Sequence, residues 1–277
     1  MSKRLEGLVA FVTGAGRGQG RSHAVRMAQE GADVIAVDVC RNIDGVTYDM
    51  ADEADLKETA RLVEATGQRV VARVADVRNM ASLAAAVDEG VGELGRLDIV
   101  CANAGINIPS SDGTLSEADW LQVIDVNLTG VWRTTTVSVP HILAGGRGGS
   151  IILTSSAAGL RGYANIVHYT AAKHGVNGLV KTLALELGPH RIRVNTLNPT
   201  QVDTPMIMNE ASYKQFSPEA PNPSRDTFAP VSQSMHVLPV PWVDPVDVSN
   251  AAVFLASEES RYITGIALPV DAGVLLK

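Results

Sequence analysis

Tyr169 and Lys173 have the residue types and the spacing of a proton-transfer pair. They lie four residues apart in a stretch whose pattern predicts a helix, so both side chains should project from the same face. A phenol is a poor acid or base at neutral pH because its reference pKa is about 10. A nearby ammonium favours the phenolate and lowers that pKa, which makes a tyrosine useful for moving a proton.

Three further polar residues stand where they could serve the same chemistry. Ser156 follows an apolar run upstream of Tyr169, and Asn103 follows another apolar run and opens the sequence Asn103-Ala104-Gly105. Asn127 lies within a predicted helix. A Tyr-x-x-x-Lys sequence alone is common by chance, so the catalytic interpretation depends on these accompanying residues.

The first apolar run leads directly into a glycine-rich turn, Gly14-Ala15-Gly16-Arg17-Gly18-Gln19-Gly20, and then into a predicted helix. Glycines allow a sharp turn and a close approach of phosphate to the backbone, and the helix N-terminus supplies free N–H groups and a positive dipole. The spacing departs from the strict G-x-G-x-x-G pattern at Gln19. Its place between strand and helix still predicts a pyrophosphate-binding turn.

Asp38 ends the second predicted strand, where a carboxylate can accept both ribose hydroxyls of an adenosine and would repel a 2′-phosphate. This favours NAD over NADP. Arg17 points the other way, toward NADP, because a basic residue in the glycine-rich turn could reach a 2′-phosphate. Alternatively, Arg17 is a solvated cation near the pyrophosphate. Asp76 ends the third predicted strand and is either an acceptor for the adenine amino group or a solvated acid.

Apolar strand candidates alternate with helical patterns along most of the chain. The apolar runs are continuous, so both faces of the sheet should be covered. The alternation predicts a single α/β domain over residues 1–277, a Rossmann-type doubly wound parallel sheet with helices on both faces. The expected strands are 8–13, 33–37, 70–75, 98–102, 151–154, 192–197 and 266–270, and the expected helices lie near 18–30, 54–66, 79–93, 116–143, 168–188 and 245–257.

Residues 205–243 interrupt this alternation. Seven of the 13 prolines fall between Pro218 and Pro245, and proline removes amide donors and fixes φ, which excludes core sheet. A structureless loop of this length is uncommon inside a compact domain, so we expect a lid over the substrate rather than a plain surface loop. Its apolar side chains favour a hydrophobic substrate: Met206, Met208, Phe216, Phe228 and Trp242.

Composition narrows the classes of partner. The net charge of −7 argues against nucleic acid, which needs a concentrated basic surface. No apolar run reaches the roughly 18 residues of a membrane span, and the first residues lack the apolar stretch of a signal peptide. Cys40 and Cys101 lie in apolar runs typical of reduced, buried thiols. We therefore expect a cytoplasmic protein without nucleic-acid or membrane partners and without a metal site.

Together these motifs resemble the short-chain dehydrogenase/reductase superfamily over nearly the whole chain. The matching residues are Thr13 to Gly20, Asp76, Asn103-Ala104-Gly105, Asn127, Ser156, Tyr169 and Lys173. The resemblance implies an NAD-dependent oxidoreductase that interconverts a secondary alcohol and its ketone. It implies that Tyr169 is the acid/base and that Ser156 holds the substrate oxygen. It further implies that Lys173 binds the nicotinamide ribose and lowers the pKa of Tyr169, and that Asn127 supports a proton-relay water.

The resemblance also implies the cofactor contacts and the assembly. Thr200 follows Pro199 at a position where such proteins often have glycine. Val202 and Thr204 still match positions that contact the carboxamide of the nicotinamide, so only the conformation of the turn differs from the family pattern. The helices near 116–143 and 168–188 are expected to pack across two-fold axes into a homotetramer, with residues 274–276 in another interface. The expected cofactor-binding set is Gly14, Arg17, Gly18, Gln19, Gly20, Asp38, Asp76, Val77, Asn103, Ala104, Gly105, Tyr169, Lys173, Pro199, Val202 and Thr204.

A narrower resemblance rests on an extra segment, residues 41–50, that makes the distance from Asp38 to Asp76 longer than usual in this superfamily. This segment, residues 18–23 and the ending Val270-Asp271-Ala272-Gly273 resemble the mycofactocin-coupled, carveol-dehydrogenase-like subgroup. That resemblance implies tightly held NAD, oxidation of a terpenoid- or steroid-like alcohol and an external redox partner of the mycofactocin type. Because the segment follows Asp38, it should fold over the adenine end of the dinucleotide.

Two alternatives remain open at this point. A 3-oxoacyl-thioester reductase would share the catalytic residues, but its expected preference for NADP conflicts with Asp38. A substrate carried on phosphopantetheine would also favour basic residues around the entrance to the active site. A dinucleotide-sensing regulator would keep the fold and lose the chemistry. The complete set of Ser156, Tyr169, Lys173 and Asn127 argues against a regulator.

Overall fold

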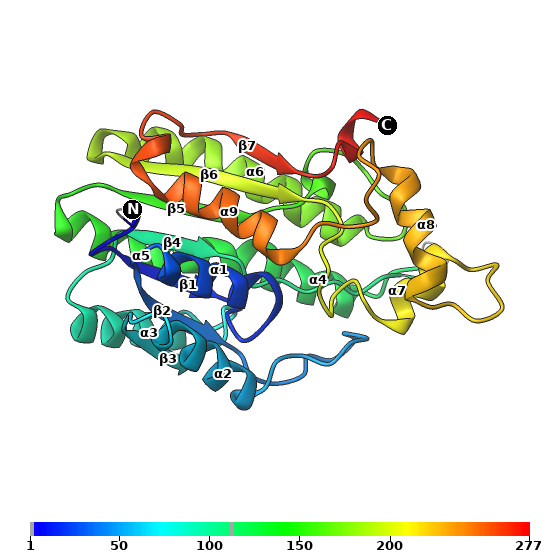
Figure 1. Ribbon diagram of the computed structural model, residues 1–277, viewed down its shortest axis with the longest axis horizontal. Coiled ribbons are helices and arrows are strands. Elements are labelled where there is room, and N and C mark those ends of the chain that lie inside the picture. Colours follow the sequence, from blue (N-terminus) through cyan, green and yellow to red (C-terminus); the bar gives the residue numbers. More distant parts are fainter. Residues whose placement is uncertain (1–2, 111–113) are drawn as a thin grey trace.

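The computed structural model describes residues 3–110 and 114–277. Its centre is a parallel sheet in the order β3-β2-β1-β4-β5-β6-β7 (Figure 1). The chain leaves β1 in one direction to form β2 and β3, then returns to the other side of β1 for β4, which creates the crevice where such sheets bind ligands. The strands are β1 Val9–Thr13, β2 Asp33–Asp38, β3 Val70–Val74, β4 Ile99–Ala102, β5 Gly149–Thr154, β6 Ile192–Pro199 and β7 Ala267–Val270.

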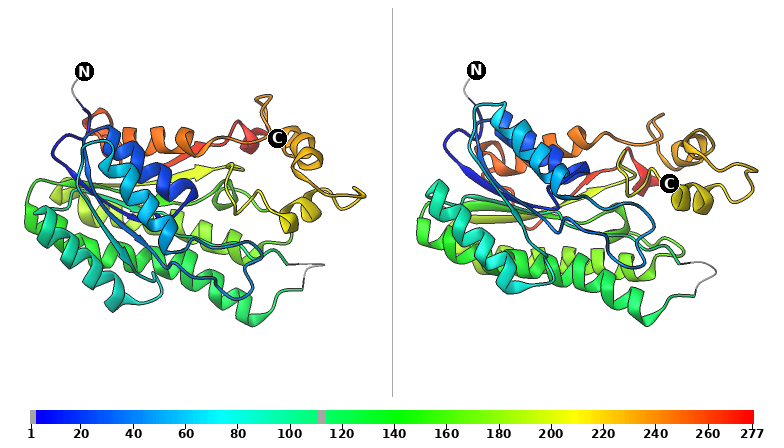
Figure 2. Two further views of the ribbon diagram at one scale, coloured as in Figure 1. Left: turned by 60° about the horizontal axis from the view of Figure 1, so that its bottom comes forward. Right: turned by 90° about the horizontal axis from the view of Figure 1, so that it is seen from below.

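Helices cover both faces of the sheet (Figure 2). One layer contains α1 Gly18–Gln29, α2 Glu53–Glu64 and α9 Pro245–Ala256. The other layer contains α3 Met80–Leu94, α4 Glu117–Ile124, α5 Gly130–Gly145 and α6 Val167–Leu187. A π-helical turn, Asp125–Thr129, joins α4 to α5. Short 3₁₀ turns occupy Ala157–Gly159, Gly188–His190, Glu258–Ser260 and Val274–Leu276.

Alternate residues of each strand feed two separate cores. In β1, Val9 and Phe11 belong to one buried cluster, and Ala10 and Val12 belong to the other. All five residues of this strand are buried. The continuous apolar runs therefore arise because each strand is covered on both sides, as predicted.

The expected strands and helices are confirmed apart from small differences at their ends. The third strand stops at Val74, so Asp76 lies two residues beyond it rather than at its end. The main difference is the segment 205–243, which contains α7 Glu210–Phe216 and α8 Arg225–Met235. Both helices lie at the end of the molecule toward which the arrows of β6 and β7 point (Figure 1).

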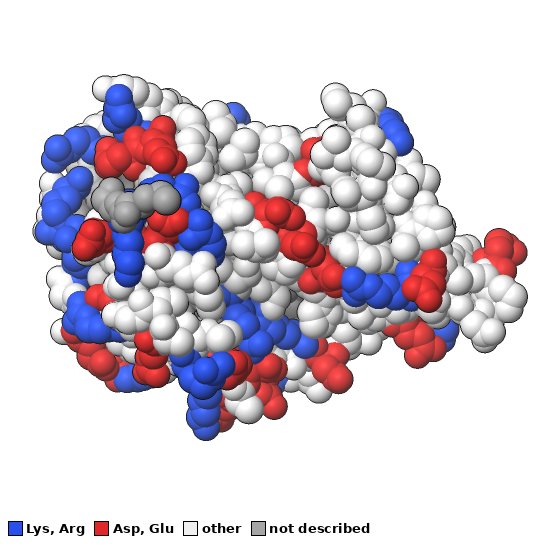
Figure 3. All heavy atoms as spheres, viewed as in Figure 1, with Lys and Arg blue, Asp and Glu red and all other residues white. Residues whose placement is uncertain are grey.

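None of the helices within residues 3–110 and 114–277 combines the length and apolar character needed to cross a bilayer. Within the same ranges, no cluster of three or more His, Cys, Asp or Glu side chains could hold a metal ion. On the face shown in Figure 3, lysine and arginine side chains are interspersed with aspartate and glutamate.

Candidate active site

The glycine-rich turn packs so closely against itself and against the loop after β4 that two of its positions have no room for a side chain. Gly14 has a φ of +67°, and a Cβ on it would lie 2.9 Å from the Ala104 Cα. A Cβ on Gly20 would lie 1.9 Å from the Gly14 carbonyl oxygen, so only glycine fits. Helix α1 begins at Gly18, and no side chain caps its N-terminus. Its first N–H groups and its dipole therefore remain available to an anion.

Asp38 is fixed at the end of β2 and is mostly buried. Its carboxylate accepts hydrogen bonds from the backbone N–H of Gly16 at 2.8 Å and of Cys40 at 3.3 Å. Burial raises the pKa of this carboxyl, and the bonds from Gly16 and Cys40 oppose that shift. The side chain is thus held beside the glycine-rich turn, where a ribose is expected.

The extra segment crosses the same groove. Tyr48 lines it together with Ile43, Met50 and Ala51, and the Arg17 guanidinium carbon lies 5.7 Å from the centroid of the Tyr48 ring. Arg17 is half-buried, and this burial lowers its pKa. Arg17 is therefore packed on an aromatic ring and is not the freely solvated cation that one interpretation of the sequence assumed.

Asp76 lies in the groove wall but is not a free acid. Arg78 donates to its Oδ2 at 2.8 Å, and so does Arg41 of the extra segment, also at 2.8 Å. Burial alone would raise the pKa of Asp76, but the hydrogen bonds from Arg78 and Arg41 lower it to about 2. The interpretation of Asp76 as a solvated acid is wrong, because its carboxylate forms salt bridges with Arg41 of the extra segment and with Arg78 in the loop after β3.

Asn103 joins the loops that follow β1 and β4. Its Nδ2 donates to the Thr13 carbonyl at 3.1 Å, and the backbone N–H groups of Asn103 and Ala104 both donate to Thr13 Oγ1 at 3.1 Å. The Thr154 hydroxyl donates to Asn103 Oδ1 at 3.3 Å. Asn103 thereby fixes the floor between the dinucleotide groove and the ends of β4 and β5.

Tyr169 and Lys173 lie on the same face of α6, as their spacing predicts. The Lys173 Nζ lies 5.4 Å from the centroid of the Tyr169 ring and donates to the Thr154 carbonyl at 2.8 Å. A Cβ on Gly105 would lie 3.6 Å from that Nζ, which places the Asn103–Gly105 turn against the pair. Lys173 as a whole is 2% exposed.

Burial moves the two pKa values toward each other. It raises the pKa of Tyr169 to about 12, with hydrogen bonding to Ser156 acting in the opposite direction. It lowers the pKa of Lys173 to about 8. The Tyr169 pKa is therefore raised and not lowered as the resemblance implied: desolvation of the phenol dominates, and the only opposing cause is the hydrogen bond to Ser156.

Ser156 begins the short turn after β5 and faces Tyr169. Its hydroxyl oxygen accepts from the Ala158 N–H at 3.1 Å, and Asn198 Nδ2 donates to the Ser156 carbonyl at 2.9 Å. The turn and the end of β6 therefore fix the direction of this hydroxyl. Ser156, Tyr169 and Lys173 all line one cavity.

Asn127 has no exposed surface and sits in the π-helical turn. Its Oδ1 accepts from the Ile106 N–H, and its Nδ2 donates to the Ile106 carbonyl, both at 2.8 Å. Its side chain thus clamps the loop after β4 and does not line either cavity. The proton-relay role of Asn127 remains a prediction.

Two adjoining hollows contain the other predicted residues. An open groove of about 840 Å³ is lined by the glycine-rich turn, Asp38, Asp76, Val77 and Ala104. A larger cavity of about 1390 Å³ is lined by Ser156, Tyr169, Lys173, Pro199 and Val202. The two hollows share the residues Gln19, Asn103, Gly105, Thr204 and Met206. A dinucleotide in the groove would therefore reach Tyr169 at its inner end.

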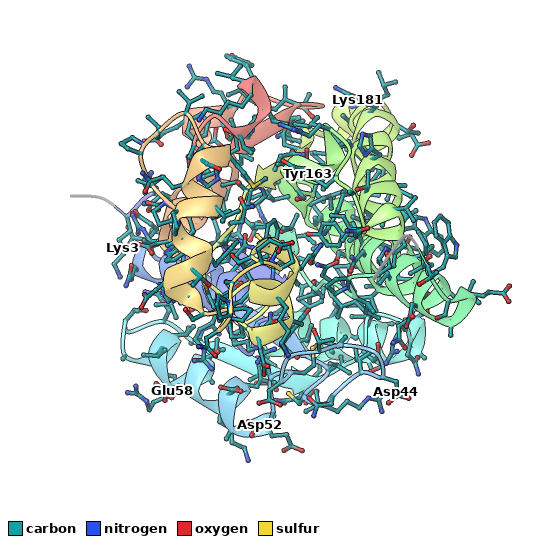
Figure 4. All side chains as sticks on the ribbon, turned by 90° about the vertical axis from the view of Figure 1, so that its right-hand side faces the viewer. Lys3, Asp44, Asp52, Glu58, Tyr163 and Lys181 are labelled. Atoms are coloured by element: carbon teal, nitrogen blue, oxygen red, sulfur yellow. The ribbon has the colours of Figure 1, made fainter. Side chains whose placement is uncertain are left out.

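Helix α7 and the residues just before it form one wall of the larger cavity, and α8 packs behind α7 without lining the cavity. Figure 4 looks onto this end of the molecule, with Tyr163 near its middle and Asp44 of the extra segment at the lower right. Met206 and Phe216 line the cavity as expected for an apolar lid, whereas Met208 does not. Phe228 and Trp242 also differ from the expectation, because Phe228 is fully buried between Tyr213, Phe216 and Trp242 at ring-centroid distances of 5.0 to 5.9 Å. They stabilise the lid from within.

Sequence reasoning missed two residues that contact these hollows. Tyr48 reaches across the groove, and its phenol oxygen accepts a hydrogen bond from the Asn107 N–H at 3.2 Å. Asn107 itself lines the larger cavity. An aromatic residue in the extra segment and a second asparagine shortly after Asn103 were the available signals, but their 59-residue separation hides the contact.

The groove fits a nicotinamide dinucleotide on three observations. The side-chain-free cradle at Gly14 and Gly20 and the uncapped start of α1 suit a pyrophosphate. Asp38 is held where its carboxylate would accept hydrogen bonds from the two hydroxyls of a ribose, and Gln19 Oε1 is buried without a partner at the junction of the two hollows. Asp38, Gln19 and the α1 N-terminus would therefore hold NAD.

The chain belongs to the short-chain dehydrogenase family, whose model matches residues 8–215. It is 58% identical over 275 residues to (−)-trans-carveol dehydrogenase of Rhodococcus erythropolis, covering 99% of both chains. It is similar to the crystal structure of carveol dehydrogenase from Mycobacterium avium in complex with NAD, with 56% identity, a TM-score of 0.98 and coverage of 99% of this chain and 100% of that one. A 3-alpha-(or 20-beta)-hydroxysteroid dehydrogenase of Mycobacterium tuberculosis is 39% identical, with 99% of this chain and 92% of that protein covered.

Proposed function

We propose that this protein is an NAD-dependent alcohol dehydrogenase that interconverts a hydrophobic secondary alcohol and its ketone. The observation that carries the proposal is the joining of the Ser156, Tyr169 and Lys173 cavity to a dinucleotide groove through Gln19, Asn103 and Gly105. The carveol and hydroxysteroid dehydrogenases among its relatives support a terpenoid- or steroid-like substrate. Two unbridged thiols, Cys40 and Cys101, accord with a cytoplasmic location.

The chain's own residues supply binding and proton transfer. When bound, NAD supplies the carbon that accepts a hydride. Ser156 orients the substrate hydroxyl, and Tyr169 takes its proton as the carbonyl forms. Lys173, held on the Thr154 carbonyl, stabilises the resulting phenolate electrostatically. Met206 and Phe216 of the lid surround the apolar part of the alcohol.

The direct test is oxidation of carveol and of a 3α-hydroxysteroid by the purified protein, with an artificial electron-accepting dye present. We expect turnover of at least one of these alcohols, with the matching ketone as product by mass spectrometry. A protein that oxidises no secondary alcohol but reduces a 3-oxoacyl thioester would support the alternative reductase function. The NAD preference that Asp38 imposes argues against that alternative.

Asp38→Ser should narrow the preference for NAD over NADP by about tenfold to a hundredfold. The wild-type carboxylate would lie beside a 2′-phosphate, and like charges at that distance repel more strongly where the site is partly desolvated. The measurement is the dissociation constant of each dinucleotide for both proteins. Tighter binding of NADP than NAD by the wild type would refute the assignment.

We propose further that the extra segment retains NAD through purification. It is tied across the groove at both ends, by Tyr48 to Asn107 and by Arg41 to Asp76. Such a cover slows dissociation more than association. The isolated protein should therefore release NAD(H) on denaturation and turn over slowly with free NAD alone, until a dye or a mycofactocin-type redox partner reoxidises the cofactor.

Tyr48→Ala tests this retention. It removes the bond to Asn107 and the ring under Arg17, so we expect the NAD off-rate to rise by about tenfold or more. Thr47→Ala is the matched control, because Thr47 is the exposed neighbour. Cofactor-free wild-type protein with rapid NAD-only turnover would place this enzyme among ordinary exchanging dehydrogenases.

A homotetramer is also part of the proposal. Trp120, Trp132 and Leu185, on α4, α5 and α6, are 37%, 44% and 80% exposed, and packing of these helices against other copies of the chain would cover them. At the C-terminus, Val274 is buried within the chain itself, whereas Leu276 is 83% exposed. Light scattering at micromolar concentration should give the mass of a tetramer, and Trp132→Lys should lower it. A wild-type monomer would contradict the proposal.

A further inference from the structure

Three polar side chains form a hydrogen-bonded network behind the turn that begins at Ser156. Thr196 and Asn198 lie two residues apart on β6 and are fully buried, and Asn177 lies on α6. The Thr196 Oγ1 lies 2.9 Å from Asn177 Oδ1 and 2.8 Å from Asn198 Oδ1, so its hydroxyl can donate to either amide oxygen. We refer to Asn177, Thr196 and Asn198 as the asparagine network.

The asparagine network holds both ends of this turn. Asn198 Nδ2 donates to the Ser156 carbonyl at 2.9 Å, and Asn177 Nδ2 donates to the Gly159 carbonyl at 2.8 Å. A carbonyl oxygen can only accept, so each amide must present its nitrogen to the turn and its oxygen to Thr196. The hydrogen bonds therefore fix the orientation of both amides and of the turn between them.

The same turn is tied directly to α6, the helix that carries Tyr169. Asn177 lies four residues after Lys173 on this helix, so the two side chains project from the same face. The Ser155 hydroxyl donates to the Lys173 carbonyl at 2.9 Å. A Cβ on Gly159 would lie 2.8 Å from that carbonyl oxygen, so the turn packs against α6 without room for a side chain. These contacts set the position of the turn relative to the Tyr169 ring.

The asparagine network does not itself contact a ligand site. The described residues that line the dinucleotide groove and the larger cavity do not include Asn177, Thr196 or Asn198, whereas Ser156 lines the cavity. The network can therefore act on a substrate only through the residues that it positions. A buried polar network whose members are paired with one another is rigid, because each bond lies in a medium of low dielectric constant.

We propose that Asn177, Thr196 and Asn198 are positioning residues that hold the Ser156 hydroxyl where alcohol oxidation requires it relative to Tyr169. This inference rests on the proposed alcohol dehydrogenase function. Ser156 orients the alcohol whose proton Tyr169 takes, so a shift of the turn misaligns this transfer without removing a reacting group. Misplacement by about 1 Å can cost about a hundredfold in rate. The network therefore contributes to kcat and not to dinucleotide affinity.

Two substitutions weaken the network to different extents. Asn198→Leu removes the donor to the Ser156 carbonyl, and Thr196→Val removes only the hydroxyl between the two amides. With an acceptor dye and whichever of carveol and a 3α-hydroxysteroid the wild type oxidises better, we expect kcat to fall by about tenfold to a hundredfold in Asn198→Leu. In Thr196→Val it should fall by about threefold to tenfold. The Kd of NAD should stay within about twofold of the wild type, because the network lies outside the groove.

The Ser156→Ala background separates positioning from general damage to the fold. If the network acts through the Ser156 hydroxyl, adding Asn198→Leu to Ser156→Ala should lower kcat by less than about threefold further, because the positioned group is already gone. A loss in this background as large as the loss in the wild type would show that Asn198 does not act through Ser156, and would overturn the inference.

Thr134→Val is the matched control for Thr196→Val. Thr134 is also fully buried, but its hydroxyl donates at 2.8 Å to the Gly130 carbonyl within its own helix, so kcat should stay within about twofold. Asn177→Leu keeps the test decisive if Asn198→Leu does not fold, because leucine favours a helix and position 177 is only partly buried.

Thermal unfolding of every variant confirms that it is folded at the assay temperature. In Asn177→Leu we expect kcat to fall by about tenfold, since the Gly159 carbonyl loses its donor. Wild-type kcat in Asn177→Leu and in Thr196→Val overturns the inference. A wild-type protein that oxidises neither alcohol overturns the proposed function instead.

Discussion

Tyr169→Phe should lower alcohol oxidation by about a thousandfold or more while leaving NAD affinity within about threefold of the wild type. The substitution keeps the ring that packs near Lys173 and removes the one group that can take the substrate proton. Ser156 cannot replace it, because an alkoxide is far less stable than a phenolate. The measurement is kcat/KM for the best alcohol, together with the Kd of the dinucleotide.

Tyr163→Phe is the matched control for that experiment. Tyr163 is a second phenol in the same cavity, and the Arg161 guanidinium lies 5.0 Å from its ring centroid. Tyr163 does not lie between Ser156 and Lys173 as Tyr169 does. Loss of the Tyr163 hydroxyl should therefore affect KM more than kcat. Equal losses in both variants, or near-normal turnover in Tyr169→Phe, would contradict the assignment of Tyr169 as the acid/base.

Features that depend on neighbouring residues could be predicted from the sequence. The four-residue spacing of Tyr169 and Lys173 fixes their common helix face. The strand-turn-helix order places Gly14 in the turn after β1 and Gly18 and Gly20 in the first turn of α1. Asp38 ends β2 as expected. In each case the local backbone determines where the side chain goes.

Features that depend on tertiary contacts could not. Asp76 was predicted as a strand-end carboxylate, but the residue that completes its neutralisation, Arg41, lies 35 positions away. Phe228 is apolar and lies in the lid, so the sequence suggested that it lines the cavity. In the structure α7 packs against α8, and Phe228 lies at the centre of an aromatic cluster instead. The bond from the Asn107 N–H to the Tyr48 phenol joins residues 59 positions apart.

The electrostatics of Tyr169 and Lys173 also could not be predicted from the sequence alone. The sequence predicts that the ammonium favours the phenolate, but it does not show that both groups are buried. Desolvation raises the pKa of Tyr169 to about 12 and lowers that of Lys173 to about 8. Each shift opposes the charged form of its group. Near pH 8 the pair can therefore lose one proton, and the remaining proton is shared between two forms without net charge, phenol with amine and phenolate with ammonium.

Lys173→Met should therefore change the pH dependence of oxidation as well as its rate. Oxidation needs the phenolate, so the wild-type rate should rise with pH and level off once the pair has lost its first proton, near pH 8. In the variant the phenol has no ammonium beside it, and its pKa of about 12 means that the rate should keep rising with pH without levelling off. At pH 7 we expect a loss of about a hundredfold or more.

Lys173→Arg and thermal unfolding provide the controls. Arginine keeps the positive charge, so it should restore the levelling-off of the rate at high pH, although its planar guanidinium should donate poorly to the Thr154 carbonyl and lower the maximum rate.

Lys173→Met also changes the pH dependence of stability, because it removes a buried amine whose pKa is lowered in the folded protein. The wild type gains stability as pH rises from about 8 toward the ordinary lysine value, and the variant should lack that gain while unfolding at no lower temperature at pH 7. A pH profile of Lys173→Met that levels off where the wild type does would show that Lys173 does not tune Tyr169.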